Sequence, residues 1–480
     1  MQPKYQYALY LILCPIVLVS YLLERFTDDV RIYLGVGFIT DKMGGVDNAW
    51  EIKPPGNRFL FETLSHIPGD GLQYQILLKA IVAIAAILII WYFAKQVSDK
   101  TGADFDVVFI LSFLSVFAIA DYVLLEVEWF CVLITMLMIG LYLSDHTLLW
   151  EIAGILALPL FLMKGISIVF VITAFAIVHL LDNRQFTDDL AFYAGLMWAG
   201  IGFVVLQLTI FPHMIADMLL SAQLSHVAQM DLYTRIITFV TMAMTAYWYI
   251  PVVAVGIALL LGVYYYDVLK HPRSFLWLLL AWISAAALPF IQGEFFQYQF
   301  AGFIIPSVIT IVWFMQLDTG WKRVFPAVIC LILFMWVFYA AGWGYAMSGY
   351  HNTYWDNRES EALALNEKYN LSNQGSILFL DPGDAPYYFR SASASRYICP
   401  MPVQRDSPEW QTNNTQAYNE TYRDIMQYNG SYIVGADRWF FQNMTPDKQA
   451  IRDKIDAGYT LVHNGSWTVY QKNRQTINTP

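Results

Sequence analysis

Long apolar stretches separated by short polar connections make up most of the first 348 positions. Each stretch is close to the ~20 residues that a helix needs to cross ~30 Å of hydrocarbon, so the pattern predicts about eleven membrane-spanning helices. The turn at Lys164-Gly165 could separate two of these helices or break a single long one. We place the spans near 7–23, 76–94, 107–121, 129–144, 148–163, 165–181, 189–211, 236–264, 275–291, 301–317 and 324–345.

A polar segment from residue 24 to residue 74 interrupts the apolar pattern after the first span. Apolar residues within it recur at helical spacing in 30–39 and in 58–67, which predicts short amphipathic helices that lie in the membrane interface. The segment also carries eight carboxylates: Glu24, Asp28, Asp29, Asp41, Asp47, Glu51, Glu62 and Asp70.

The tail from residue 349 onward has the pattern of a small folded domain. Three short runs rich in β-branched and aromatic residues, at 376–380, 432–434 and 467–470, predict strands. Thr445 and Pro446 fit the N-cap and first turn of a helix that Gly458 would end. We therefore predict a transmembrane catalytic domain over 1–348, with the active site on the 24–74 loop, and a soluble α/β domain over 349–480.

Composition supports a polytopic α-helical membrane protein. Hydrophobic residues account for 57% of the 480 positions and charged residues for only 14%, which does not fit several soluble domains or a disordered chain. The formal net charge of −10 argues against a nucleic-acid partner, because the phosphate backbone attracts the opposite sign. Cys14, Cys131 and Cys330 lie in apolar runs and only Cys399 lies in a polar region, so these four cysteines predict neither a zinc cluster nor a disulfide framework.

The basic residues of the short connections predict the orientation. Cytoplasmic loops carry an excess of Lys and Arg, and under the proposed span count these residues fall on one side. The N-terminus is therefore expected in the cytoplasm, and the loop and tail outside. The basic residues concerned are Lys4, Lys95, Lys100, Arg184, Lys270, Arg273, Lys322 and Arg323.

Acids and bases are interleaved on the outer loop. A carboxylate such as Asp28 can act as a general base, and the cations Arg31 and Lys53 can hold a lipid phosphate at headgroup depth. The same residues also fit an acidic, solvated loop whose charges pair with one another.

The order of these residues resembles a known family. Asp28 and Asp29, then Arg31 and Tyr33, follow the first span, and a Lys53-Pro54-Pro55 motif follows on the same loop. This arrangement is similar to the C-type glycosyltransferases that use polyprenyl-phosphate sugars, especially protein O-mannosyltransferases and the lipid A aminoarabinose transferase. The resemblance implies inverting transfer of one sugar to a protein, lipid or glycan acceptor, at the outer face of a prokaryotic plasma membrane.

The resemblance also implies roles for individual residues. Asp28 matches the catalytic base, whereas Asp29 stands where relatives often have Glu. Glu51 lies one residue further from Lys53 than in the nearest relatives, which leaves its role open. The candidates on the loop are Asp28 and Asp29 as catalytic residues, Arg31 and Lys53 for the donor phosphate, and Glu51 for substrate.

Later positions supply further candidates. Glu126 and Glu128 follow the third span where relatives show an acid, and hydrated loop carboxylates are the alternative. Lys164 at a Lys-Gly turn could reach the same phosphate or simply extend to the interface. Tyr298 matches a family tyrosine, although Gln297 departs from the pattern. We assign Glu128 as catalytic, Lys164 to the donor phosphate, and Glu126 and Tyr298 to substrate.

A divalent metal ion is a further expectation, because some relatives hold one near the site. His66 and His213 are its candidate ligands, although single histidines are weak evidence for a metal. Gly35-x-Gly37 lacks the context of a dinucleotide-binding motif and is interpreted as helix packing.

Two other functions remain open. A transporter or lipid-linked glycan flippase would place ionisable residues inside the spans, whereas most charges here lie at span ends. A glycan ligase or polymerase with a diphosphate-linked donor could use the same cations, so the sequence does not separate it from a monophosphate-dependent enzyme.

Overall fold

The computed structural model describes residues 14–45, 48–49, 53–69, 71–117, 125–182, 184–224, 231–245, 272–292, 297–316, 357–404, 415–435 and 437–473. The chain forms two compact units. Unit 1 comprises Met1–Glu24, Gln75–Leu206 and Ser225–Gly349, and unit 2 comprises Arg25–Tyr74, Gln207–Leu224 and Tyr350–Pro480. In its contacts the 24–74 loop therefore groups with the tail, whereas the sequence-based division placed it with the transmembrane segment.

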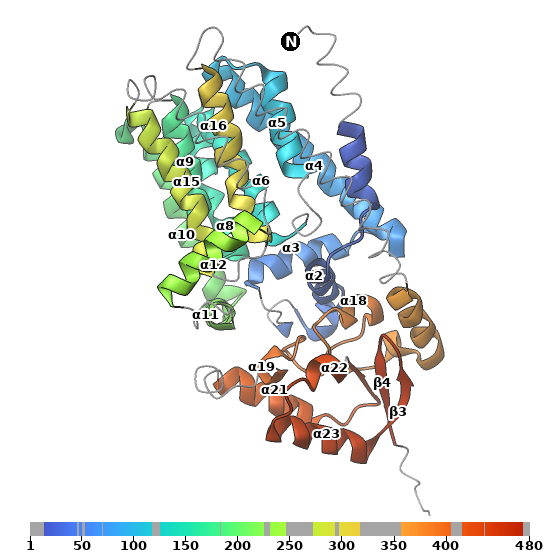
Figure 1. The fold of residues 1–480 in the computed structure, drawn as a ribbon. Helices are drawn as coiled ribbons and strands as arrows, with labels where there is room; N and C mark the ends of the chain where they lie inside the picture. The colour runs from blue at the N-terminus through green and yellow to red at the C-terminus, as the bar shows by residue number, and fades with distance from the viewer. Residues whose placement is uncertain are drawn as a thin grey trace, which may run out of the picture. The chain divides into compact units, whose positions relative to one another are not determined.

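Unit 1 is built from apolar helices (Figure 1). Three helices in the described part of the chain are long and apolar enough to cross a membrane, namely Gly71–Thr101, Phe186–Thr209 and Pro272–Gln292. The number of spans, about eleven, stays a prediction. The helices are Cys14–Leu23, α4 (Gly71–Thr101, whose first turn belongs to unit 2), α5 (Phe105–Phe117), α6 (Val127–Leu143), α7 (Thr147–Ile155), α8 (Ala157–Met163), α9 (Ile168–Asp182), α10 (Leu190–Thr209), α12 (Leu232–Thr245), α15 (Pro272–Gln292) and α16 (Ile304–Gln316).

Most predicted spans coincide with these helices. The turn at Lys164 separates two elements, because α8 ends at Met163 and α9 begins at Ile168. The predicted span at 324–345 lies outside the described residues, as do parts of those at 7–23, 107–121 and 236–264.

The two helices predicted in the loop are present in unit 2 as α2 (Asp28–Ile39) and α3 (Pro55–Ser65). That these helices lie in the membrane interface stays a prediction. Nine of the 12 residues of α2 are buried, and its sequence is apolar on nearly every face, which is typical of a buried helix. By contrast, α3 is amphipathic: it buries Asn57, Arg58 and Phe61, while Phe59 is 60% exposed.

Glycines allow α2 to approach its neighbours closely. A Cβ atom added at Gly35 would lie 2.7 Å from the backbone nitrogen of Tyr387, in α18 (Ala385–Phe389). One added at Gly37 would lie 2.6 Å from the carbonyl oxygen of Phe61 in α3. Both positions exclude a side chain, so the Gly35-x-Gly37 pattern serves helix packing. It holds α2 against α18 and α3.

The tail forms a four-stranded sheet in the order β1-β2-β4-β3. Strand β1 (Leu378–Leu380) pairs in parallel with β2 (Tyr432–Gly435), with Phe379 opposite Val434. Strand β4 (Thr468–Lys472) pairs antiparallel with β2 and with β3 (Tyr459–Asn464). The remaining tail elements are η7 (Leu371–Asn373), α18, α19 (Met401–Gln404), α21 (Thr415–Gln427), α22 (Asp437–Phe440) and α23 (Pro446–Gly458).

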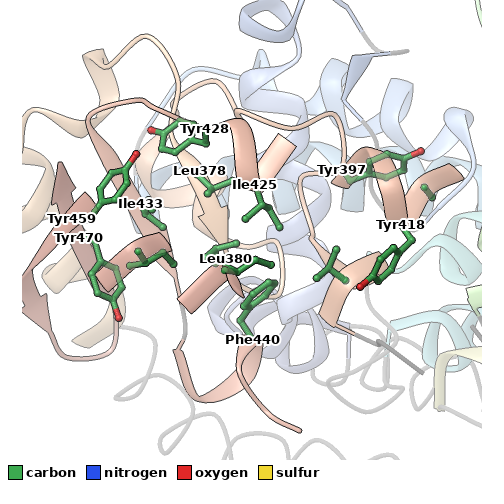
Figure 2. Close-up of a cluster of buried hydrophobic side chains, with 14 residues drawn as sticks. Leu378, Leu380, Tyr397, Tyr418, Ile425, Tyr428, Ile433, Phe440, Tyr459 and Tyr470 are labelled. Carbon is green, nitrogen blue, oxygen red and sulfur yellow. The ribbon is translucent and has the colours of Figure 1, made fainter. Parts of the chain in front are cut away.

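One hydrophobic core joins the sheet to the helices of the tail (Figure 2). Leu378 and Ile433 contribute from the sheet, and Ile425 and Ile455 from α21 and α23. Burying such side chains contributes roughly 1.5–3 kcal/mol each. Because Leu378 and Leu380 belong to this core, it fixes the strand that precedes the loop after β1.

The predicted α/β character of the tail is confirmed. All three predicted strands are present, and the Thr445 side chain caps α23 by accepting a hydrogen bond from the Lys448 amide at 3.4 Å. The helix ends at Gly458 as predicted. Strand β3, which follows directly, was not predicted.

Candidate active site

The first turn of α2 carries the acids of the candidate site. Thr27 is the N-cap and its side chain accepts a hydrogen bond from the Val30 amide at 3.3 Å. Asp28 and Asp29 occupy the first turn, where negative charge is favoured by the helix dipole. The Thr27 cap therefore places both acids at the start of α2.

Asp28 and Arg31 form an ion pair one turn apart. The Asp28 Oδ1 and Arg31 Nη1 atoms are 3.7 Å apart. The Asp28 side chain is 64% exposed, whereas the Arg31 side chain is 2% exposed. The acid is therefore accessible to a ligand, and the guanidinium supports it from the protein side.

The tail contributes a second ion pair to the same cluster. Asp384 lies at the end of the loop after β1, and its Oδ1 accepts a hydrogen bond from Arg358 Nη2 at 2.9 Å. The Arg358 guanidinium lies 3.9 Å from the centroid of the Trp467 ring, and the Arg358 carbonyl accepts a hydrogen bond from the Trp467 indole at 3.1 Å. Both members of the pair are buried. Trp467 thus fixes the position of the Arg358 guanidinium, which pairs with Asp384.

These charges act on Asp28. The surrounding protein displaces water from the Asp28 carboxyl group, although much of the side chain remains accessible, and this raises its pKa to about 6. Asp384 also raises this pKa, Arg31 and Arg358 lower it, and Asp29 raises it slightly. A carboxyl group with such a pKa is ionised at neutral pH yet remains basic enough to accept a proton.

Two further buried groups adjoin Asp384. Asp381 accepts hydrogen bonds from the amides of Gly383 and Ala385 at 3.0 and 2.9 Å. Its pKa is raised well above the usual range by burial and by the neighbouring Asp384 carboxyl group. Burial likewise raises the pKa of Tyr388. The Tyr388 hydroxyl has no hydrogen-bond partner among the described residues.

Lys53 lies at the adjacent face of α2. Its Nζ atom is 5.9 Å from the centroid of the Tyr33 ring. The Tyr33 hydroxyl in turn donates a hydrogen bond to Asp29 Oδ2 at 3.3 Å. Lys53 is half-buried, so of the two loop cations it is the more accessible. The structure thus groups four predicted residues, Asp28, Asp29, Arg31 and Lys53, around α2.

The candidates from the later spans lie in unit 1. Lys164 and Glu128 form an ion pair, and their side chains are 11% and 1% exposed. The charge of Lys164 is therefore compensated by Glu128. Glu126 is the buried N-cap residue of α6. The catalytic, phosphate and substrate roles of these residues stay predictions.

The other predicted site residues are Glu51, Tyr298 and the candidate metal ligands. Glu51 lies outside the described residues, and Tyr298 belongs to η5 (Gln297–Phe303) with an undescribed side chain. His66 Nδ1 lies 2.8 Å from the Glu62 carbonyl oxygen. Within the described part of the chain, no group of three or more His, Cys, Asp or Glu could hold a metal ion.

Sequence reasoning missed Asp384 and Arg358, whose pairing with the loop depends on the tertiary fold. It also missed Asp217 of α11 (Met214–Leu224), which accepts hydrogen bonds from Arg58 at 2.8 Å and from Arg396 at 2.9 Å. A single acid within an apolar helix such as α11 was a signal for a buried ion pair. This network ties three segments of unit 2 together.

Comparisons with known proteins find one similar structure. No protein-family model matches the sequence, and no curated protein matches it. The crystal structure of ArnT from Cupriavidus metallidurans, bound to undecaprenyl phosphate, is similar over 98% of this chain and 99% of its own, with 14% sequence identity and a TM-score of 0.41.

Proposed function

We propose that the protein is a membrane glycosyltransferase that moves one sugar from a polyprenyl-phosphate donor to an acceptor hydroxyl, with inversion. The observation that carries this proposal is the state of Asp28. It is an accessible carboxylate with a pKa raised to about 6, held beside the Arg31 guanidinium on a loop that also carries Lys53. Such a group can remove a proton from a hydroxyl at neutral pH.

The reaction follows from these positions. Asp28 accepts the proton of the acceptor hydroxyl while the oxygen attacks the anomeric carbon and the bond to phosphate breaks. The phosphate leaves with additional negative charge, which a nearby cation stabilises more strongly in the transition state than in the ground state. Lys53 is the accessible cation for this role. With 2% of its side chain exposed, Arg31 acts on the phosphate through its charge rather than by direct contact.

For the acceptor and the sugar, only the chemical class is proposed. A protein, lipid or glycan hydroxyl fits the general-base chemistry equally well. The orientation of the chain, with loop and tail on the non-cytoplasmic face of a prokaryotic plasma membrane, is part of the proposal and is supported by the Lys/Arg distribution.

A transfer assay with the purified full chain tests the proposal. Asp28→Asn should lower transfer from a synthetic polyprenyl-monophosphate sugar by ~10²–10⁴-fold, because it removes the base and hardly changes the shape. Asp453→Asn is the matched control, since it makes the same change at an exposed position of α23 and should leave the rate unaltered. Near-normal transfer by Asp28→Asn would contradict the role of Asp28.

The same assay separates the two rival functions. A ligase or polymerase would prefer a diphosphate-linked donor, so both donors are offered at equal concentration. A transporter or flippase would move the lipid in reconstituted vesicles and release no transfer product with either donor.

A further inference from the structure

We propose that Asp384 is a positioning residue: with Arg358 it forms a charge pair that the tail holds against α2, and this pair acts on the Asp28 base of the loop. The inference rests on the proposed function for the role of Asp28, but the coupling between the residues can be measured without it. Asp384 and Asp28 are 356 positions apart in the sequence, and both belong to unit 2.

Close packing brings the loop after β1 to α2. Gly383 adopts φ +113, a conformation that favours glycine. A Cβ atom added there would lie 3.4 Å from Ile32 Cγ2 on α2. One residue further along, Asp384 begins the turn into α18, and α18 in turn contacts Gly35 of α2. Contacts on both sides of Asp384 therefore hold it against α2.

The position of this loop agrees with a functional role. Asp381 and Asp384 follow the carboxyl end of β1, which is paired in parallel with β2. In open α/β sheets, ligands often bind outside the carboxyl ends of parallel strands. The tail therefore presents this edge to the helix that carries the base.

The charges that face Asp28 come from both elements. Arg31 and Asp29 are on α2 itself, and Asp384 and Arg358 come from the tail. Asp384 favours the protonated form of Asp28 and Arg358 the ionised form, so the pair exerts two opposed effects. If the pair were only structural, removing either charge would change the stability of the tail, but the two changes would not shift the pKa of Asp28 in opposite directions.

The experiment measures the protonation of Asp28 directly. A water-soluble carbodiimide with an amine couples only to the protonated carboxyl group, and the accessible Asp28 is resolved from Asp29 by fragmentation of the labelled peptide. In the full chain, labelling of Asp28 should fall with a midpoint near pH 6. Asp384→Asn should lower the midpoint by about one pH unit, and Arg358→Gln should raise it. Asp453→Asn should leave it unchanged, and Asp384→Glu should restore it.

Transfer measured over the same pH range completes the test. The acid limb of the rate should move with the labelling midpoint in each variant. A midpoint that stays fixed in both Asp384→Asn and Arg358→Gln would overturn the inference, whether or not the protein transfers sugar. Shifted labelling in a parent protein that transfers no sugar would support the coupling and reject the proposed function. Shifted labelling with an unmoved acid limb would overturn the role of the pair in catalysis.

Discussion

Asp28 and Arg31 have their charged groups 3.7 Å apart on α2, yet 64% of the Asp28 side chain is exposed against 2% of the Arg31 side chain. This asymmetry separates their roles. The acid can meet a substrate, whereas the guanidinium holds the acid and lowers its pKa against the effect of desolvation.

The first prediction separates Arg31 from Lys53. Arg31→Ala removes a charge that lowers the Asp28 pKa, so the acid limb of transfer should move to higher pH. Lys53→Ala should instead weaken the donor contact and raise the donor KM by roughly 10-fold or more, since a charge-assisted hydrogen bond contributes about 1.5–3 kcal/mol. Kinetics as a function of pH and donor concentration distinguish the two effects. Equal behaviour of the two variants would contradict the division of roles.

The second prediction concerns stability and pH. The Asp28 pKa lies near 6 in the folded protein and near 3.8 in the unfolded chain, so between these values the folded state binds a proton that the unfolded state has released. The contribution of Asp28 to the free energy of unfolding therefore falls as pH rises from about 4 to 6 and is constant above that range. Asn does not titrate. Compared with the parent, Asp28→Asn should thus gain thermal stability progressively from pH 4 to pH 6.

Thermal unfolding of both full chains in the same detergent, at half-unit steps of pH, provides the measurement. Asp381 also has a raised pKa, but it is present in both proteins and cancels in the difference. A difference in unfolding midpoint that does not depend on pH would show that Asp28 titrates normally.

Local features of unit 2 were predictable from the sequence, whereas its long-range pairs were not. The apolar spacing in 30–39 and the Thr445-Pro446 signal correctly predicted α2 and α23, because helix starts and faces depend on neighbouring residues. Strand β3 was missed because it is a largely exposed edge strand without a clear alternation. The family resemblance gave Asp28 its predicted role. Asp384 could not be found, because only the folded tail places it beside α2.

The third prediction tests the contact between the loop and the tail at Gly35. Its added Cβ would lie 2.7 Å from the backbone nitrogen of Tyr387, and a backbone atom cannot move aside as a flexible side chain can. Gly35→Ala should therefore force α2 and α18 apart and cost about 1–3 kcal/mol, as overpacking usually does. Gly458→Ala is the matched control, because a Cβ there meets nothing within 4 Å.

Hydrogen exchange reports where the contact loosens. In Gly35→Ala, amides of α2 and α18 should exchange faster, while those of β2 and β4 in the tail sheet should keep the parental rates because the core of the tail is untouched. Separation of α18 from α2 would also move Asp384 and its partner Arg358 away from Asp28; because Asp384 has the larger effect of the two and burial of Asp28 also decreases, the carbodiimide midpoint of Asp28 should fall. If α18 of Gly35→Ala exchanges at the parental rate and the labelling midpoint of Asp28 is unchanged, then Gly35 does not hold the Asp384–Arg358 pair near Asp28.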